Sequence, residues 1–174
     1  NIPIQAAVES FNARRDILTT AARDAFPLVP QSWYLDTFAA QSALYCNHGG
    51  TRDLGSFDGT SLADLTAAEK LSRRQVIEML EALRAFGGDA FREAELLNAG
   101  PQVGVRETRR IKGLYELTEA DAKNGARFED AVAWRSGFLD IGFVRYERMK
   151  IHDVPYRSLV PEKIDGLLAA GRCI

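Results

Sequence analysis

The segment between residues 71 and 86 constrains the fold of this chain most strongly, because its apolar side chains recur every three or four positions. Such a recurrence places them in one stripe along a helix. The stripe consists of Leu71, Val76, Ile77, Leu80, Leu83 and Phe86. Thr66 followed by Glu69 has the pattern of a capping box, and Gly87 with Gly88 would end the helix. We therefore expect a long amphipathic helix that begins near Thr66 and buries its stripe against other elements.

Helical patterns also dominate the rest of the first half. Residues 4–26 carry apolar side chains at helical spacing, with a break or drift expected near Arg14–Asp16, and Pro27 and Pro30 end this pattern. We expect two further short helices, one over residues 33–45 and one over residues 90–97. Between them, residues 51–60 are rich in Gly and Asp and are expected to form a loop.

The pattern changes after Val103, where β-branched and aromatic residues gather in runs typical of strands. We expect an extended segment over residues 103–117, a capped helix over residues 118–125 and a second short helix over residues 127–136. A strand region should follow over residues 138–149, and a strand buried on both faces over residues 167–170. The predicted fold class is α+β, with a helical first half and strands after residue 103. Trp33 and Trp134 are expected in the core.

Composition excludes several classes of function. With 174 residues the chain is long enough for one domain that buries roughly 70% of its unfolded surface. Basic and acidic residues nearly cancel, 22 against 24, so nonspecific binding to nucleic acid or to an anionic membrane is not expected. Apolar runs are too short to span a bilayer and no export signal is recognised, so a cytoplasmic location is expected.

The two cysteines, Cys46 and Cys173, lie far apart and neither belongs to a CxxC pair. We expect two reduced thiols and no metal site. Cys46 lies near His48, which would allow a thiol with its base, but two residues in one loop rarely reach the geometry of a nucleophile and base.

A compact charged block, Arg106–Arg110, interrupts the predicted extended segment. Alternation places Arg106, Thr108 and Arg110 on one face and Glu107 and Arg109 on the other. Two explanations stay open: a solvated or salt-bridged edge, or a site for an anionic or polar ligand. Arginine suits the second, because a planar guanidinium holds a carboxylate or phosphate at two points.

Three ordered blocks carry a resemblance to a known family. They are "VGVRETRRIKGLYELTEAD" (Val103–Asp121), "RFEDAVA" (Arg127–Ala133) and "VPYRSLVPEKIDGLLAAGRCI" (Val154–Ile174). Together they resemble the C-terminal half of the FAD-dependent oxidoreductases whose members carry GVRETRRI and IPYRSLVP…NLLVAGRCIS. The preceding helix, "SRRQVIEMLEALRAF", is similar to that family as well.

The resemblance implies a two-domain flavoprotein, in which a nucleotide-binding domain holds FAD and a substrate or cap domain closes over its isoalloxazine ring. Residues 1–153 would form a helix-rich, cap-like domain, and residues 154–174 would include the strand that returns to the FAD-binding domain. At the junction, the catalytic residues would be Arg106, Glu107 and Arg109. The cofactor would contact Tyr156, Arg157, Gly171, Arg172 and Cys173. His152 lies in the same tail and is expected to be structural.

Departures from the family pattern limit what the resemblance implies. The sequence contains no GxGxxG that would seat the pyrophosphate of FAD, and Asp140–Gly142 stands where family members often show Asp-Ile-His. We therefore expect a portion of an FAD-dependent oxidoreductase that acts by hydride transfer from an organic substrate to flavin. By itself the chain would bind FAD poorly and be inactive. Its partners would be the FAD-binding remainder, a small-molecule substrate and, in a further alternative, a second copy.

A rival interpretation is a non-catalytic helical module that binds another protein. The two interpretations differ in one observable feature. The flavoprotein interpretation predicts an exposed apolar patch around residues 154–174, and the rival predicts none.

Overall fold

The computed structural model describes residues 4–31, 33–37, 43–47, 49–51, 54–138 and 148–174. The chain divides into two compact units, residues 1–104 (unit 1) and residues 105–174 (unit 2). The fold class is α+β as predicted, with the long helices in unit 1 and the longer strand pair in unit 2, although a short strand pair also lies in unit 1. His48 and Asp140–Gly142, which the sequence singled out, lie outside the described residues.

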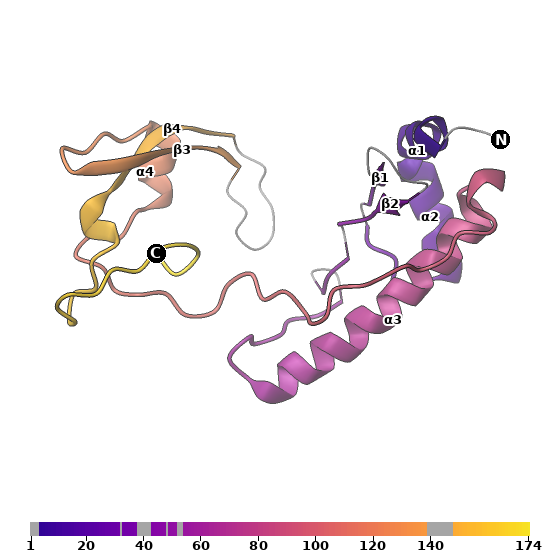
Figure 1. Cartoon of the computed structure of the whole chain (residues 1–174), viewed down its shortest axis with the longest axis horizontal. Coiled ribbons are helices and arrows are strands. Elements are labelled where there is room, and N and C mark those ends of the chain that lie inside the picture. Colours follow the sequence, from indigo (N-terminus) through magenta and orange to yellow (C-terminus); the bar gives the residue numbers. More distant parts are fainter. Residues whose placement is uncertain (1–3, 32, 38–42, 48, 52–53, 139–147) are drawn as a thin grey trace. The chain divides into compact units, whose positions relative to one another are not determined.

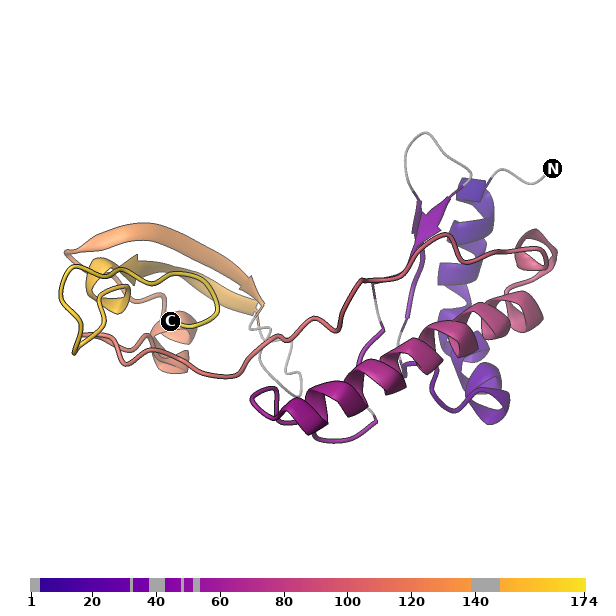
Figure 2. The ribbon, with the colours of Figure 1, turned by 60° about the horizontal axis from the view of Figure 1, so that its bottom comes forward.

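Unit 1 holds three α-helices, a short 3-10 helix and a two-stranded hairpin (Figures 1 and 2). In chain order these elements are α1 (Ile4–Ala13), α2 (Arg15–Ala25), β1 (Asp36–Thr37), β2 (Leu44–Tyr45), α3 (Leu62–Phe86) and η1 (Asp89–Phe91). The break between α1 and α2 falls at Arg14, within the Arg14–Asp16 segment near which the sequence predicted a break or drift. One apolar cluster joins these elements, with the Phe11 ring edge-on to Trp33 at 5.1 Å and to Phe91 at 6.0 Å between centroids.

The long helix α3 begins five residues earlier than the predicted capping box at Thr66 requires. Ser61 is its N-cap, and the Ser61 side chain accepts a hydrogen bond from the Asp64 N–H at 3.3 Å. The predicted capping box at Thr66 is therefore wrong: the Thr66 hydroxyl donates to the carbonyl of Leu62 inside the helix. Glu69 is used elsewhere, since its carboxylate accepts the N–H of Val103.

The buried face of α3 is also displaced from the predicted stripe. Its buried members are Ala68, Gln75, Met79, Ala82 and Leu83, whereas Ile77 is 49% exposed. Gln75 is 1% exposed because its amide donates to the carbonyls of Leu28 and Gly50 and accepts the N–H of Gly50. A fully bonded polar side chain therefore connects the helix to two loops.

Two of the predicted short helices in unit 1 are wrong. Residues 33–45 contain β1 and β2, which pair antiparallel with Asp36 opposite Tyr45. The reason is visible in the burial pattern, since Trp33 and Leu35 are buried and Tyr34 between them is 39% exposed, which is the period of a strand. In the range 90–97 only η1 forms, and the carbonyl of Ala94 instead accepts a hydrogen bond from Arg84.

Unit 2 holds one α-helix, a longer hairpin and a 3-10 turn: α4 (Glu119–Asn124), β3 (Ala131–Phe138), β4 (Arg148–Pro155) and η2 (Tyr156–Ser158). Helix α4 has the predicted capping box at Thr118 and Asp121, and it ends at Gly125, whose φ of 73° is in the left-handed region. β3 and β4 pair antiparallel, with bulges on either side of Ala133–Arg135. Figure 1 shows α4 lying against this hairpin.

Three other expectations for unit 2 are corrected. The predicted helix over residues 127–136 is wrong, because β4 supplies the backbone partners that turn this short apolar run into β3. Trp134 lies on β3 and is 78% exposed, not in the core. The predicted strand Leu167–Ala170 does not form: glycines 166 and 171, with φ of 71° and 99°, turn the chain at both ends, and Leu167 and Leu168 are about half exposed.

Candidate functional site

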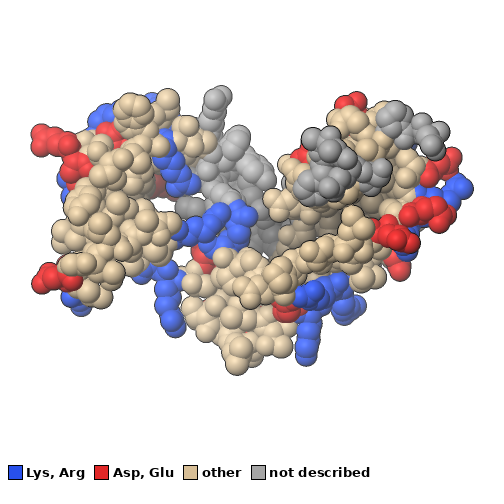
Figure 3. All heavy atoms as spheres, viewed as in Figure 1, with Lys and Arg blue, Asp and Glu red and all other residues tan. Residues whose placement is uncertain are grey.

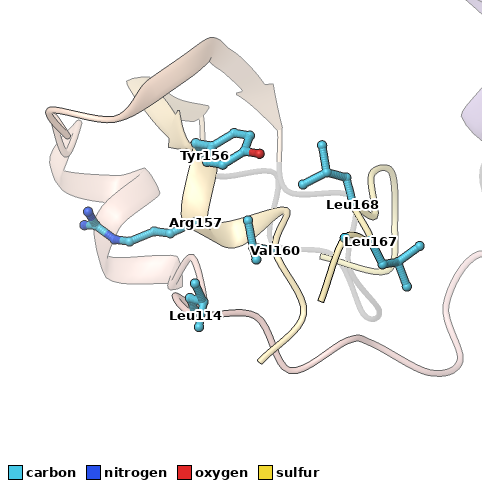
Figure 4. A pocket seen from close by; sticks show the side chains of 7 residues that line it. Leu114, Tyr156, Arg157, Val160, Leu167 and Leu168 are labelled. Carbon is cyan, nitrogen blue, oxygen red and sulfur yellow. The ribbon is translucent and has the colours of Figure 1, made fainter. Parts of the chain in front are cut away.

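A hollow of about 420 Å³ lies in unit 2 and contains two of the predicted cofactor residues (Figure 4). It is lined by Leu114, Tyr156, Arg157, Val160, Gly166, Leu167 and Leu168. In Figure 4 the Tyr156 ring and the Leu168 side chain face the same space, while the guanidinium of Arg157 extends away from them. The surface offered to a ligand is therefore mainly apolar, with a phenol at one side.

Backbone hydrogen bonds hold the two walls of this hollow together. The Leu114 N–H donates to the carbonyl of Val160 at 2.9 Å, and the Glu162 N–H donates to that of Lys112 at 2.9 Å. Gly113 lies between them in a bridge with Pro161, and a Cβ on Gly113 would come within 3.0 Å of the carbonyl oxygen of Ser158. The glycine therefore allows the segments to approach each other.

Arg157 fastens η2 to the rest of unit 2. Its guanidinium lies 2.9 Å from the Asp130 carboxylate, and its backbone N–H donates to the same carboxylate at 3.1 Å. The guanidinium also lies over the rings of Tyr115 and Phe128, at 4.9 and 5.3 Å from their centroids. Since the Asp130 carbonyl accepts the Tyr156 N–H at 2.7 Å, this cluster determines where Tyr156 lies.

A second polar cluster, around Asp121, contacts the first one through Tyr115. The Asp121 carboxylate accepts hydrogen bonds from Tyr115 at 2.9 Å and from the Thr118 hydroxyl and N–H at 2.7 and 2.9 Å. Burial favours a higher pKa for Asp121, but these hydrogen bonds outweigh it and hold the pKa below its ordinary value. Burial and the bond to Asp121 raise the pKa of Tyr115, so the pair is a neutral phenol and a charged carboxylate at neutral pH.

Asp153 and His152 occupy neighbouring buried positions on β4. The Asp153 carboxylate accepts the Phe128 N–H at 3.0 Å and the Arg127 guanidinium at 2.7 Å, and these bonds lower its pKa. His152 is 2% exposed, with Nδ1 at 2.9 Å from the Lys150 carbonyl oxygen and Nε2 without a hydrogen-bond partner among the described residues. The structural role expected for His152 stays a prediction.

The structure brings the charged block and the C-terminal signature together. The Ile111 N–H, directly after Arg110, donates to the carbonyl of Cys173 at 2.7 Å. Every residue of the block is exposed, and the carboxylate of Glu107 forms an ion pair with Arg110 at 2.8 Å. Two segments that the sequence analysis selected separately are thus adjacent.

The remaining predicted cofactor residues differ in their surroundings. Gly171 is exposed, and a Cβ placed on it would meet nothing within 4 Å, so its backbone is open to an approaching group. The Cys173 thiol forms no disulfide, and its sulfur lies 3.4 Å from the carbonyl oxygen of Ala170. Cys173 is half-buried.

Sequence reasoning missed the residues that position this site. The contacts described above are made by Asp130, Asp121 and the Arg127–Asp153 pair. Each of these is an acidic or basic residue in a stretch where such residues are common. The only sequence signal at Asp130 is its place inside the second resemblance block, which carries no indication of a partner 27 residues later. Only Asp121 was noticed, as a capping residue.

Neither the charge distribution nor the helix lengths of the described residues select a particular class of partner for the site. On the face drawn in Figure 3, acidic and basic side chains are interspersed. Among the residues with described placement, no three His, Cys, Asp or Glu side chains converge as metal ligands would. No helix in the described part of the chain combines the length and apolarity that crossing a bilayer requires.

Comparison with known proteins gives one match. A family model described as FAD dependent oxidoreductase matches residues 5–174, nearly the whole chain. Comparison with curated proteins finds no match, and comparison with solved structures finds none either.

Proposed function

Because this chain belongs to the FAD dependent oxidoreductase family, we propose that it supplies the substrate-side portion of an enzyme that transfers a hydride from an organic substrate to FAD. The observation that carries the proposal is the hydrogen bond between Ile111 and Cys173, which joins the GVRETRR block to the AGRC segment. These are the two segments to which the family resemblance assigns catalysis and cofactor contact.

The residues of unit 2 fit contact with one part of FAD. The apolar hollow beside Tyr156 suits a flat aromatic ring system, and the open backbone at Gly171 allows close approach. We assign cofactor contact to Tyr156, Gly171, Arg172 and Cys173. Arg157 has a different role in this proposal, since its guanidinium binds Asp130 and therefore holds Tyr156 in place.

FAD, when bound, is the two-electron oxidant that takes a hydride from a substrate carbon while a proton leaves the substrate for solvent. The contribution of this chain is to bind and orient the substrate. Arg106 and Arg109 hold and polarise it, because exposed guanidinium groups attract developing or resident negative charge. Glu107 acts through Arg110, with which it is paired, and keeps the block in one arrangement.

We further propose that the isolated chain is inactive. The sequence has no GxGxxG loop, and hence no such backbone site for the pyrophosphate of FAD. The FAD-binding remainder of the enzyme would provide that site. Tyr156, Ile164, Leu167 and Leu168 are 46–55% exposed, and these exposed apolar side chains support the expectation of an apolar patch around residues 154–174.

The first experiment is a titration of the purified chain with FAD, followed by flavin fluorescence, together with a visible spectrum of the protein as isolated. We expect no saturable quenching and no bound flavin. Tight saturable binding, or a reproducible flavin-dependent rate from the pure chain, would show that the chain completes a flavin site by itself and would reject the proposed inactivity.

The second experiment tests the reaction in the complete enzyme that contains this chain. Anaerobic mixing with substrate should bleach the flavin absorbance, and Arg106→Ala and Arg109→Ala should each slow bleaching by about 10²-fold. Arg15→Ala, an exposed arginine of unit 1, is the matched control and should leave the rate unchanged. If both variants reduce flavin at the wild-type rate, the block has no catalytic role.

The family membership does not favour the rival, a non-catalytic helical interaction module. The apolar patch argues against it as well, because that interpretation predicts none.

A further inference from the structure

We propose that the outer edge of strand β3, centred on Trp134 and Arg135, accepts a strand from the FAD-binding remainder of the enzyme. The strand that fits has apolar side chains at alternate positions and an acidic side chain beside Arg135. The inference rests on the proposed function only for the source of this partner, because the edge itself is argued from the contacts of unit 2.

The two outer edges of the β3–β4 hairpin differ. The outer edge of β4 is occupied, since the Asp153 N–H donates to the Ala126 carbonyl at 3.0 Å. Gly125 lies at the same edge, where a Cβ on it would come within 3.2 Å of the Ile151 carbonyl oxygen. Among the described residues, β3 pairs with β4 alone, and residues 132–138 make no backbone hydrogen bond outside that pairing. One edge of the hairpin is therefore covered and the other is open.

The register shows which backbone groups lie at the open edge. Trp134 is paired with Asp153, and the Asp153 N–H points away from β3 toward Ala126. In an antiparallel ladder, both residues of such a pair direct their N–H and C=O groups outward. The N–H and carbonyl of Trp134 are therefore the groups that an added strand would bond. The bulges limit the regular stretch to Ala133–Arg135, and an unpaired edge of this kind is a template for another strand.

The side chains along β3 give this edge an apolar surface. Residues 131–136 are all exposed, with Val132 at 51% and Trp134 at 78%. Ala131–Trp134 line a second hollow, of about 330 Å³. In strand addition, main-chain hydrogen bonds supply affinity, and the spaces for alternate side chains supply specificity. The partner strand therefore places apolar side chains beside Val132 and Trp134.

Charge decides which strand fits this edge. β3 and β4 together contain three basic residues, Arg135, Arg148 and Lys150, and one acidic residue, Asp153. Asp153 is already paired with Arg127 at 2.7 Å, whereas Arg135 is exposed and forms no ion pair with a described residue. Opposite charges across a strand pair are favourable and like charges are unfavourable. The edge therefore selects a strand with a carboxylate beside Arg135 over a second copy of β3, which has no acidic residue.

The first test is calorimetric titration of the purified chain with the peptide acetyl-Ser-Val-Glu-Val-Glu-Val-Ser-amide. This peptide should bind saturably and about fivefold more tightly than the same peptide with lysine in place of both glutamates. N-methylation of one central residue should weaken binding at least about tenfold, and N-methylation of the next residue should leave it unchanged, because successive N–H groups of a strand point to opposite edges. Equal binding of the two charge forms, equal binding of the two methylated forms, or no binding of the glutamate peptide would overturn the proposal.

Variants of the chain locate the edge. Trp134→Ala should weaken binding of the glutamate peptide about tenfold, and Leu97→Ala, which removes an exposed apolar side chain of unit 1, should leave it unchanged. Arg135→Glu should reverse the preference, so that the lysine peptide binds more tightly. Arg92→Glu makes the same change of charge at an exposed position of unit 1 and should not reverse it. If both arginine variants reverse the preference, or if neither does, the assignment to Arg135 is wrong.

The second test asks whether the FAD-binding remainder is the partner. Amide hydrogen exchange at Trp134 should be at least about 10²-fold slower in the complete enzyme than in the isolated chain. Light scattering should show the isolated chain as a monomer. A dimer with a protected Trp134 amide would make a second copy the occupant and would reject the proposal.

The outcomes in the complete enzyme separate this inference from the proposed function. A Trp134 amide that exchanges as fast as in the isolated chain, in an enzyme whose flavin is bleached by substrate, rejects only the docking of a strand at this edge. A protected amide in an enzyme whose flavin is not bleached by substrate rejects the proposed function and supports the docking.

Discussion

Unit 1 is held together by an apolar core, whereas unit 2 is held together by polar contacts around a few side chains. Of the fourteen buried hydrophobic residues among those described, only Ala122 and Met149 belong to unit 2. Nine of the sixteen large exposed hydrophobic residues belong to unit 2, although it is the shorter unit. The interior of unit 2 is built instead from His152, Asp153, Ser158 and their hydrogen-bond partners.

This difference bears on where the folding stability of the chain comes from. Burial of apolar area is the main source of folding stability, and unit 1 has most of it. In unit 2 large apolar side chains are exposed instead, and their burial adds correspondingly less to the stability of this unit. We therefore expect core substitutions to be most damaging in unit 1 and polar substitutions to be most damaging in unit 2.

The two tryptophans test the comparison with the largest effect. Trp33→Ala should lower the free energy of unfolding by about 3–5 kcal/mol, because Trp33 is 2% exposed and packs against Phe11. Trp134→Ala should change it by less than about 0.5 kcal/mol, because Trp134 is 78% exposed. Urea unfolding followed by far-UV circular dichroism measures both. Similar losses in the two variants would mean that Trp134 is buried in solution.

Gly87 tests how closely unit 1 is packed at the end of α3. A Cβ at this position would lie 2.4 Å from the Leu83 carbonyl oxygen and 2.9 Å from the Phe91 ring. Gly87→Ala should therefore cost about 3 kcal/mol in the same unfolding experiment. Gly104→Ala is the matched control, since a Cβ there meets nothing within 4 Å, and it should leave the unfolding curve unchanged.

The polar cluster of unit 2 is tested by Asp130→Asn. The substitution removes the charge that binds the Arg157 guanidinium, and we expect a loss of about 1–2 kcal/mol, reduced by the partial exposure of both side chains. Amide hydrogen exchange of Tyr115 and Tyr156, whose N–H groups bond to Arg157 and Asp130, should report the loss locally. Asp16→Asn removes an exposed ion pair at 3.7 Å in unit 1 and should have no measurable effect. If amide hydrogen exchange is unchanged in Asp130→Asn, the cluster around Asp130 and Arg157 does not stabilise unit 2.

Acid sensitivity should be the smallest of these effects and should be concentrated in unit 2. The pKa values of Asp121 and Asp153 are lower in the folded chain than the usual value near 4. Their contribution to stability is therefore complete above about pH 4 and is lost as the pH falls through the folded-state pKa values. Hydrogen exchange in unit 2 should accelerate below about pH 4, and Asp121→Asn should remove part of that dependence. An identical pH profile in this variant would contradict the assignment.

Local patterns predicted the elements whose signals are complete within a few residues. The break at Arg14, the capping box at Thr118, the stop at Gly125 and the body of α3 belong to this group. The predictions for residues 33–45, 127–136 and 167–170 were wrong, because short apolar runs are compatible with either periodicity until a neighbour is present. Pairing with β4 makes residues 131–138 a strand. No paired strand lies beside Leu167–Ala170 among the described residues, so this run is irregular.

The candidate site divides in the same way. The charged block and the C-terminal signature were recognisable in the sequence, because their residue types are unusual in an extended segment and because they resemble a family to which the chain belongs. Their adjacency through Ile111 and Cys173, and the use of Arg157 as a clamp on Asp130, were not recognisable. Such contacts join residues 27 or more positions apart, and no local pattern encodes a distance of that kind.

The sequence by itself determined the fold class, the body of the long helix α3, the capped start of α4 and the family. Only the tertiary structure decided which face of α3 is buried, which runs become strands, and which arginine is a structural clamp and which is exposed. The physical reason is that secondary-structure signals are summed over neighbours along the chain, whereas burial and ion pairing depend on partners brought together by folding.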